Sequence, residues 1–286
     1  MYWIRDLTGL YLRKVRGRPH HRSCILVTPK PAWPSAARSG LSMRPVDSSQ
    51  GGSWFTLDHS PTYQATQMRF LSAVESLNPD LIVALLNTHP MHIDSMLQLS
   101  DICKMGDDSA MAAELVERTL YALESSFHPC FSLASGTSHL DYKRQENRAL
   151  FIALFRHLHF VGSRACYRTA LEICKVLLVL DPTVDPLAIV LLIDFYALRA
   201  RQNQWLIDLY TAWNPTRNLS QLPNFSFSTA LATFHLAQET TGDKAMALTI
   251  SADSLLQEAL LSFPSVLLPL LDKCSIEPHS DVVRLL

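Results

Sequence analysis

The sequence lacks the motifs that mark common enzyme and cofactor sites. Its nine glycines, among 286 residues, form neither GxGxxG nor GxxxxGK, which excludes both familiar phosphate-binding loops. It also contains no HExxH, no nucleophile elbow and no deaminase signature. We therefore expect a protein that is not an enzyme and that carries no cofactor.

Cysteine is sparse and follows no site pattern. There is no CxxC pair and no Cys/His ladder with zinc spacing. His157 and His159 lie two residues apart, so on a helix they would point apart and could not share a metal. We expect the thiols to be reduced, small apolar side chains of a cytosolic or nuclear protein. The six cysteines are Cys24, Cys103, Cys130, Cys166, Cys174 and Cys274.

Long hydrophobic runs are absent as well. No stretch of about 18 apolar residues is free of charge and proline, as a membrane span would require. The first residues alternate apolar with charged side chains, unlike the apolar core of a secretory signal. We therefore expect no membrane partner and no secretion.

Charge is nearly balanced over the whole chain, with a net charge of −1, but it is unevenly placed. Residues 1–45 contain nine Lys/Arg and one acid, about +8, which leaves about −9 for the remainder. A basic arm of this kind suggests an anionic partner, such as RNA or an acidic protein surface. A charge run alone, however, favours a solvated tail or a nuclear-targeting patch.

What the sequence does contain is apolar residues at helical spacing, and 48% of its residues are hydrophobic. Several expected helices end at X-Pro, because proline disfavours helical geometry at the residue before it. Four helices fill 151–213, with breaks at 161–164, 181–186 and 201–203. The other expected helices cover 63–77, 80–88, 93–105, 109–127, 225–238 and 244–263, with one more from 266.

One central segment is apolar on nearly every side. Asp185 is expected to cap a helix with Pro186 at its first position, followed by the apolar run 187–193. A helix that is apolar all round is buried between neighbours. Asp194 would then need a partner, for which we consider Arg199, Arg201 or a backbone N–H.

Three segments share one pattern of small residue, leucine, charge, apolar pair and proline: MAAELVERTLYALESSFHP, YRTALEICKVLLVLDP and SADSLLQEALLSFP. This pattern is typical of the second helix of a tetratricopeptide-like repeat. We predict an all-α fold in which 61–286 form a tetratricopeptide-like α-solenoid of antiparallel helix pairs. A compact bundle is the alternative. Residues 1–60, rich in Pro, Ser and Gly, are expected to form a disordered or extended arm.

Candidate partner contacts lie in three places. Trp33, between Ala32 and Pro34, either docks on a partner or folds back onto its own chain. Two loops combine residue types that are favoured in protein interfaces, although each could equally be a packed corner. Their candidate residues are Arg199, Arg201 and Trp205 in one, and Arg217, Asn218, Gln221 and Phe225 in the other.

Several long strings carry a resemblance: SPTYQATQMRFLSAVESLNPD, HIDSMLQLSDIC, CYRTALEICKVLLVLDPTVDP and RNLSQLPNFSFS. They resemble the transcription factor 25 family, also called nuclear localised protein 1, which is similar to yeast ribosome quality control complex subunit 1. The resemblance covers about residues 24–286 and does not extend to 1–23. The family's acidic, lysine-rich N-terminal region is not matched, so the chain resembles a truncated or alternative form.

The resemblance implies a non-catalytic adaptor of ribosome-associated quality control, in the cytosol and nucleus. It implies work beside a listerin-type ubiquitin ligase on large ribosomal subunits that carry stalled chains. There the family favours degradative-linkage ubiquitin chains, which recruit the segregase valosin-containing protein. An alternative implied function is a nuclear transcriptional repressor that acts through protein or nucleic-acid contacts.

Overall fold

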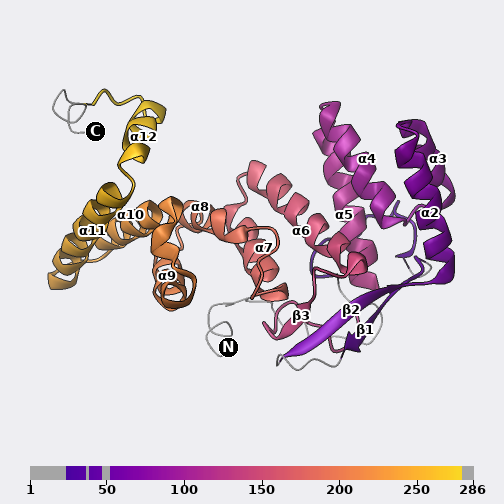
Figure 1. Cartoon of the computed structure of the whole chain (residues 1–286), viewed down its shortest axis with the longest axis horizontal. Coiled ribbons are helices and arrows are strands. Elements are labelled where there is room, and N and C mark those ends of the chain that lie inside the picture. The colour runs from indigo at the N-terminus through magenta and orange to yellow at the C-terminus, as the bar shows by residue number, and fades with distance from the viewer. Residues whose placement is uncertain (1–23, 37–38, 47–51, 279–286) are drawn as a thin grey trace. The chain divides into compact units, whose positions relative to one another are not determined.

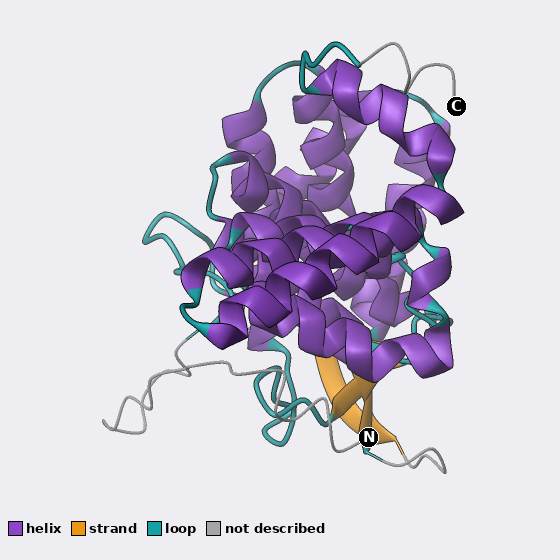
Figure 2. Cartoon of the chain, turned by 90° about the vertical axis from the view of Figure 1, so that its left-hand side faces the viewer, coloured by secondary structure: helices purple, strands orange, loops and turns teal. Residues whose placement is uncertain are grey.

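The structure is a computed structural model that describes residues 24–36, 39–46 and 52–278. The chain forms two compact units, of which unit 1 ends at Ile189 and unit 2 begins at Val190. Helices dominate both units, and the strands are confined to unit 1 within the described residues (Figures 1 and 2).

Unit 1 contains consecutive helices, and side chains cap the starts of the first four. The Ser60 hydroxyl accepts from the N–H of Tyr63 (3.2 Å), and the Asp108 carboxylate accepts from the N–H of Met111 (2.9 Å). Such caps satisfy N–H groups that have no partner within the helix. Each helix contacts the next along the chain. The helices are α2 (Pro61–Glu75), α3 (Pro79–Thr88), α4 (Ile93–Met105), α5 (Ser109–Ser125), α6 (Gln145–Ser163) and α7 (Tyr167–Leu180).

A small sheet accompanies these helices, with its strands in the order β1 (Leu41–Val46), β2 (Ser53–His59) and β3 (Ser138–Leu140). β1 runs antiparallel to β2, with Leu41 opposite His59, and β3 runs parallel to β2. Figure 1 shows the strands at one edge of unit 1, beneath α5 and α6 in that view. Because β1 and β3 both pair with β2, β2 is the central strand of the sheet, and it also contacts α6.

Asn147 of α6 joins the helices to the sheet. Its side-chain oxygen accepts from the N–H of Leu57 in β2 (2.8 Å), and its amide donates to the carbonyl of Asp141 (2.9 Å). Both polar ends of this buried side chain are thus satisfied, as burial requires. Around it lies the core of unit 1, whose largest fully buried side chains include Ile93, Met96, Leu120, Leu123, Leu140, Leu150, Phe151, Leu154, Leu158 and Leu171.

Unit 2 is a second series of helices. α10 is central, because it contacts α8, α9 and α11. α10 and α11 form its most extensive helix pair. The elements are η2 (Ile189–Leu191, at the start), α8 (Ile193–Arg199), α9 (Asn203–Arg217), η3 (Leu219–Gln221), α10 (Pro223–Glu239), α11 (Asp243–Ser262), η4 (Pro264–Val266) and α12 (Leu267–Lys273).

The prediction of an all-α fold is wrong, because the sheet is present. The segment 24–60, expected to be irregular, contains β1 and β2, and the connection 131–144 contains β3. These strands carry weak sequence signals: β1 holds Pro45, and β3 has only three residues. The mostly helical character is confirmed, and the solenoid arrangement stays a prediction.

The helix expected over 185–193 is wrong. Asp185 and Ala188 have φ angles of 45° and 51°, which a right-handed helix does not allow. The Asp185 carboxylate does cap, but it accepts from the N–H of Ile189 (2.9 Å) and so begins the short η2 instead. Burial on every side is also wrong, because Leu191 is 54% exposed.

The other expected helices agree with the structure in existence and order. The largest boundary difference is at α6, which begins at Gln145 rather than at Phe151. α9 continues through Pro215 to Arg217 rather than ending at Trp213. The proline ring there is tolerated near the helix end, where a left-handed Asn218 (φ 51°) follows as the C-cap.

No single helix within the described ranges is long and apolar enough to cross a membrane. One pair, Asp243–Ser262 with Pro264–Lys273, passes the combined length and composition test but is bent by 96° at its break.

Candidate partner-binding groove

An open groove of about 890 Å³ lies in unit 1 between α2, α4 and α6, beside the ends of β1 and β2. Its volume lies within the range of small-molecule pockets, but the groove is open to solvent rather than enclosed. The residues that line it include Tyr63, Gln67, Met68 and Leu71 from α2, Ile93, Asp94 and Leu97 from α4, and Glu146, Ile152 and Arg156 from α6.

A chain of hydrogen bonds lies behind the α2 wall of the groove. Nε2 of His92 is 2.9 Å from Oε1 of Gln67, and Nδ1 of His92 is 2.8 Å from Oγ of Ser95. Because the amide oxygen of Gln67 can only accept, Nε2 of His92 carries the proton and Nδ1 accepts. Gln67 also hydrogen bonds to the Asp94 carboxyl, so the chain of bonds orients that group at the groove.

Burial favours the neutral form of three titratable groups in this wall, His92, Asp94 and Tyr63, and shifts the pKa of each accordingly. It lowers the pKa of His92 to about 4, and it raises the pKa of the Asp94 carboxyl despite the hydrogen bond from Gln67. Burial also raises the pKa of Tyr63, whose hydroxyl accepts from the N–H of Ile93 (3.2 Å). These groups hold α2 against α4 and suit a rigid binding surface.

Exposed apolar side chains flank the groove. Met68 is 65% exposed and Leu71 is 41% exposed, both on α2. Across the groove, the Arg156 guanidinium donates to the carbonyl of Leu97 (2.5 Å) and pairs with Asp101 (2.6 Å). Arg156 thus fixes α6 against α4 and its charge is neutralised. Apolar surface gathered beside a cleft is typical of a protein-binding site.

Trp33 folds back onto its own chain. Its indole N–H donates to Glu114 of α5 (3.2 Å), and its ring centroid is 5.9 Å from that of Tyr121. Lys30 pairs with the same Glu114 carboxylate at 2.6 Å. One positive charge of the basic arm, that of Lys30, is therefore paired within this chain, and residues 1–23 of the arm lie outside the described residues.

The first predicted contact loop is the corner between α8 and α9 in unit 2. Arg199 is the last residue of α8, Arg201 follows with a φ of 53°, and Trp205 lies in the first turn of α9. Arg199 and Arg201 are exposed and Trp205 is half-buried. The structure thus keeps these three residues in one corner of unit 2.

The second predicted loop divides between surface and core. The Arg217 guanidinium lies 4.4 Å from the centre of the Trp213 ring, a cation–π contact. Asn218 and Gln221 are exposed, whereas Phe225 is fully buried. Phe225 therefore packs in the core, whereas Asn218 and Gln221 lie at the surface and Arg217 packs on Trp213.

Asp194 is a buried structural acceptor. It receives hydrogen bonds from the Asn224 amide (2.9 Å) and the Ser228 hydroxyl (2.6 Å), both from α10. These partners come from a helix about thirty residues later, which no local pattern identifies. The carboxylate joins α8 to α10 and so supports the corner described above.

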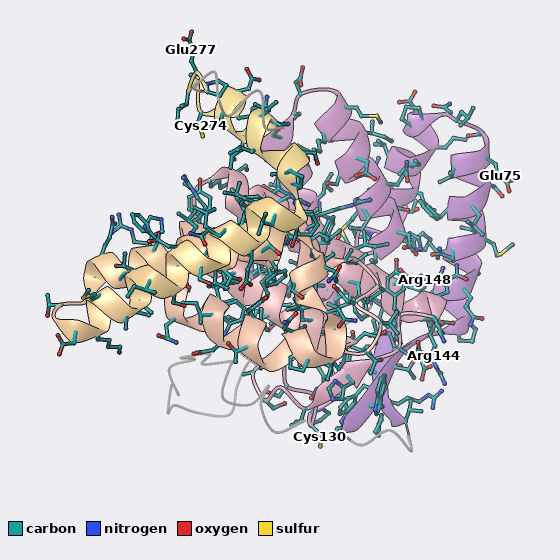
Figure 3. All side chains as sticks on the ribbon, turned by 60° about the vertical axis from the view of Figure 1, so that its left-hand side comes forward. Glu75, Cys130, Arg144, Arg148, Cys274 and Glu277 are labelled. Atoms are coloured by element: carbon teal, nitrogen blue, oxygen red, sulfur yellow. The ribbon has the colours of Figure 1, made fainter. Side chains whose placement is uncertain are left out.

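The cysteines differ from the expectation of core thiols. Cys174 is buried, but Cys130, Cys166 and Cys274 are exposed; Figure 3 labels Cys130 and Cys274 at the surface. Burial raises the pKa of Cys24 and Cys103, which favours the unreactive thiol. Within the described ranges, no group of three His, Cys, Asp or Glu residues could hold a metal ion.

No sequence pattern predicted the groove. Asp94 and Glu146 each stand in the first turn of a helix, where an acid is an ordinary partner for the helix dipole. They share one groove only because α4 packs on α6.

Comparison with known proteins gives a consistent result. The family model described as "Transcriptional repressor TCF25" matches residues 55–285. The human "Ribosome quality control complex subunit TCF25" is 49% identical over 98% of this chain. The subunit of the same name from Dictyostelium discoideum is 40% identical over 82% of the chain, and "Ribosome quality control complex subunit 1" of Schizosaccharomyces pombe is 39% identical over 85%.

The chain spans 42%, 34% and 38% of these three relatives, respectively, so it corresponds to less than half of each. No solved structure matches it.

Proposed function

We propose that this chain, which belongs to the TCF25 family, acts as a non-catalytic adaptor in ribosome-associated quality control. The observation that carries the proposal is the 49% identity, over 98% of the chain, to a human subunit of the ribosome quality control complex. Because the chain spans 42% of that relative, the activity of the whole relative enters here only as part of the proposal.

The geometry supports binding through surfaces. Unit 1 offers the groove flanked by Met68 and Leu71, held rigid by hydrogen bonds and by the Arg156 contacts. Unit 2 offers the two corners, where Arg199, Arg201, Trp205, Arg217, Asn218 and Gln221 are the proposed contacts. Phe225 would support the second corner from inside. Arginine and tryptophan are common anchors of protein interfaces.

The partners follow from the family resemblance. They are a listerin-type ubiquitin ligase, the large ribosomal subunit, ubiquitin and the segregase valosin-containing protein. In this function the adaptor favours degradative-linkage ubiquitin chains on stalled polypeptides, which promotes their extraction. The corresponding location is the cytosol, with a nuclear fraction.

We also retain the tetratricopeptide-like arrangement as a proposal. Consecutive helices contact one another from α2 to α7 in unit 1 and from α8 to α11 in unit 2. Contact between sequence neighbours is the defining property of repeat architectures, which present long surfaces to protein partners.

A second candidate function is transcriptional regulation. It is favoured by the description of the family model as a transcriptional repressor and by the basic arm at residues 1–45. A mobility-shift titration of the full chain with DNA and RNA tests it. Binding that weakens steeply with salt would support this function, and no shift at any salt concentration would remove it.

The test of the main proposal is affinity capture of the tagged chain from cells that translate a stalling reporter. The expected result is recovery of large-subunit proteins together with the ubiquitin ligase, and more of both with the stalling reporter than with a normally terminating one. Recovery of neither would contradict the proposal.

A further inference from the structure

We infer that the outer face of α5 is a binding site for a proline-containing segment bearing lysine and tryptophan, and that residues 24–36 occupy it in cis. These residues are called the strap below. The proposal goes beyond the proposed function and does not depend on it.

The receptor consists of three α5 side chains at helical spacing, Glu114, Tyr121 and Glu124. Steps of seven and three residues place them along one side of the helix. They meet the strap about 80 to 100 residues away in sequence, through hydrogen bonds, an ion pair and a ring contact. Each of the three side chains contacts a different feature of the bound segment.

Glu124 accepts hydrogen bonds from the backbone of the strap. One oxygen of its carboxylate accepts from the N–H of Ile25, and the other accepts from the N–H of Leu26 at 3.1 Å. Only 9% of Glu124 is exposed. Without the strap this carboxylate would lose both hydrogen bonds, and charge-assisted bonds of this kind are stronger than neutral ones. The face therefore favours an occupant that presents two consecutive backbone N–H groups.

Glu114 and Tyr121 contact side chains of the strap. Glu114 accepts from Lys30 Nζ at 2.6 Å and from the Trp33 indole N–H at 3.2 Å, so one carboxylate recognises two groups three residues apart. These bonds lower the pKa of Glu114. The Tyr121 ring packs at 5.9 Å from the Trp33 ring, and the Lys30 ammonium lies 5.7 Å from that same indole. Recognition thus requires Lys-x-x-Trp.

The strap has the properties of a replaceable ligand. Its middle, residues 28–32, is exposed, and Ile25 is 56% exposed. Val27 and Ala36 are its buried apolar side chains, so little apolar area holds it in place. Its three prolines, Pro29, Pro31 and Pro34, restrict the backbone in advance, which lowers the entropy cost of docking. A turn closed by the N–H of Trp33 and the carbonyl of Lys30 (3.0 Å) brings both side chains to Glu114. A segment of another protein with the same features can compete for the face.

The test measures binding of a fluorescent peptide with the strap sequence, CILVTPKPAWPSA, to the full chain. Wild-type chain and a strap-release variant, Lys30→Ala with Trp33→Ala, are compared by fluorescence anisotropy. We expect the release variant to bind at least tenfold more tightly than wild type. Adding Glu114→Gln to the release variant should reverse that gain about tenfold.

The matched control is Glu117→Gln in the release background. Glu117 lies on the same helix but pairs with Arg164 rather than with the strap. Its substitution should leave peptide affinity within about twofold. Equal affinity for the wild-type and release chains, no binding to either, or equal losses from the Glu114 and Glu117 substitutions would each overturn the inference.

A second measurement covers the case in which the release variant is destabilised. Hydrogen exchange of strap residues 24–36 is followed in wild type and in Glu124→Gln, which retains one acceptor oxygen instead of two. We expect the strap amides to exchange at least tenfold faster in the variant, with unchanged exchange in α4. Unchanged strap exchange would contradict the assigned contact.

Discussion

The indole N–H of Trp33 donates a hydrogen bond to the carboxylate of Glu114, 81 residues away in sequence. Lys30 shares that carboxylate, so a positive charge of the arm is neutralised on a helix of the same chain. The uneven charge of the sequence is thus partly explained within the molecule. An external partner of this face must replace both contacts.

Substitutions at the groove should weaken partner capture without unfolding the chain. We expect Met68→Asp with Leu71→Asp to lower recovery of large-subunit proteins at least fivefold, because two charges would enter an apolar rim. The control is Met105→Asp at the end of α4, whose side chain is 77% exposed and does not line the groove. Equal recovery with both variants would remove the groove from the binding surface.

Acid should destabilise unit 1 through His92 and His157. Burial lowers the pKa of both to about 4, from an ordinary value of 6.5. Between these values the unfolded chain binds more protons, so stability is lost as the pH falls from 6.5 toward 4. The full effect is about 3 kcal/mol for each histidine.

Urea unfolding at pH 7.5, 6 and 5 checks this dependence in wild type and in His92→Gln. The variant should lose less stability between pH 7.5 and pH 5 than wild type does. Identical pH slopes for the two chains would mean that His92 is not held neutral.

Removing the Asp194 carboxylate should destabilise unit 2. Asp194→Ala leaves the Asn224 amide and the Ser228 hydroxyl without their acceptor, a loss of about 2–4 kcal/mol. Faster hydrogen exchange in α8 and α10 is the readout. Asp208→Ala, at an exposed acid whose carboxylate accepts from the Gln204 amide of the same helix (2.8 Å), should change exchange little. Similar effects of the two substitutions would contradict the role of Asp194.

Gly40 should resist replacement by alanine. Its φ is +78°, and an added Cβ would lie 2.7 Å from the Ser60 hydroxyl oxygen that caps α2. The expected cost is about 1–3 kcal/mol, visible as a lower Tm. Gly106→Ala is the control, since Gly106 has a φ of −88° and its nearest atoms would be 3.6 Å away. A Gly40→Ala chain as stable as Gly106→Ala would contradict the close approach of Gly40 to Ser60.

The helices could be predicted because their information is local. Apolar spacing and X-Pro endings indicated the helices from α2 to α7 and from α9 to α12 in order. The helix prediction failed for residues 185–193 because two residues with left-handed backbone angles, Asp185 and Ala188, interrupt the segment. The composition of that segment is typical of a buried helix. No composition rule distinguishes such an interruption from a cap that begins a helix.

The sheet and the groove depend on contacts that are distant in sequence. β2 pairs with β3 across more than eighty residues, from Ser53 to Ser138, and its inner N–H at Leu57 bonds to Asn147. The same holds for Asp194, whose partners lie on α10. For Trp33 the sequence left two alternatives open, an external partner and its own chain, and only the hydrogen bond to Glu114 decides between them.

The central claim is that this chain joins stalled large ribosomal subunits as a non-catalytic component. Sucrose-gradient sedimentation of lysates from cells that accumulate peptide-linked large subunits tests it most directly. The account predicts that the chain moves into the large-subunit fraction when such complexes accumulate, and returns toward the top when they are resolved. A chain that stays at the top of the gradient under both conditions would contradict it.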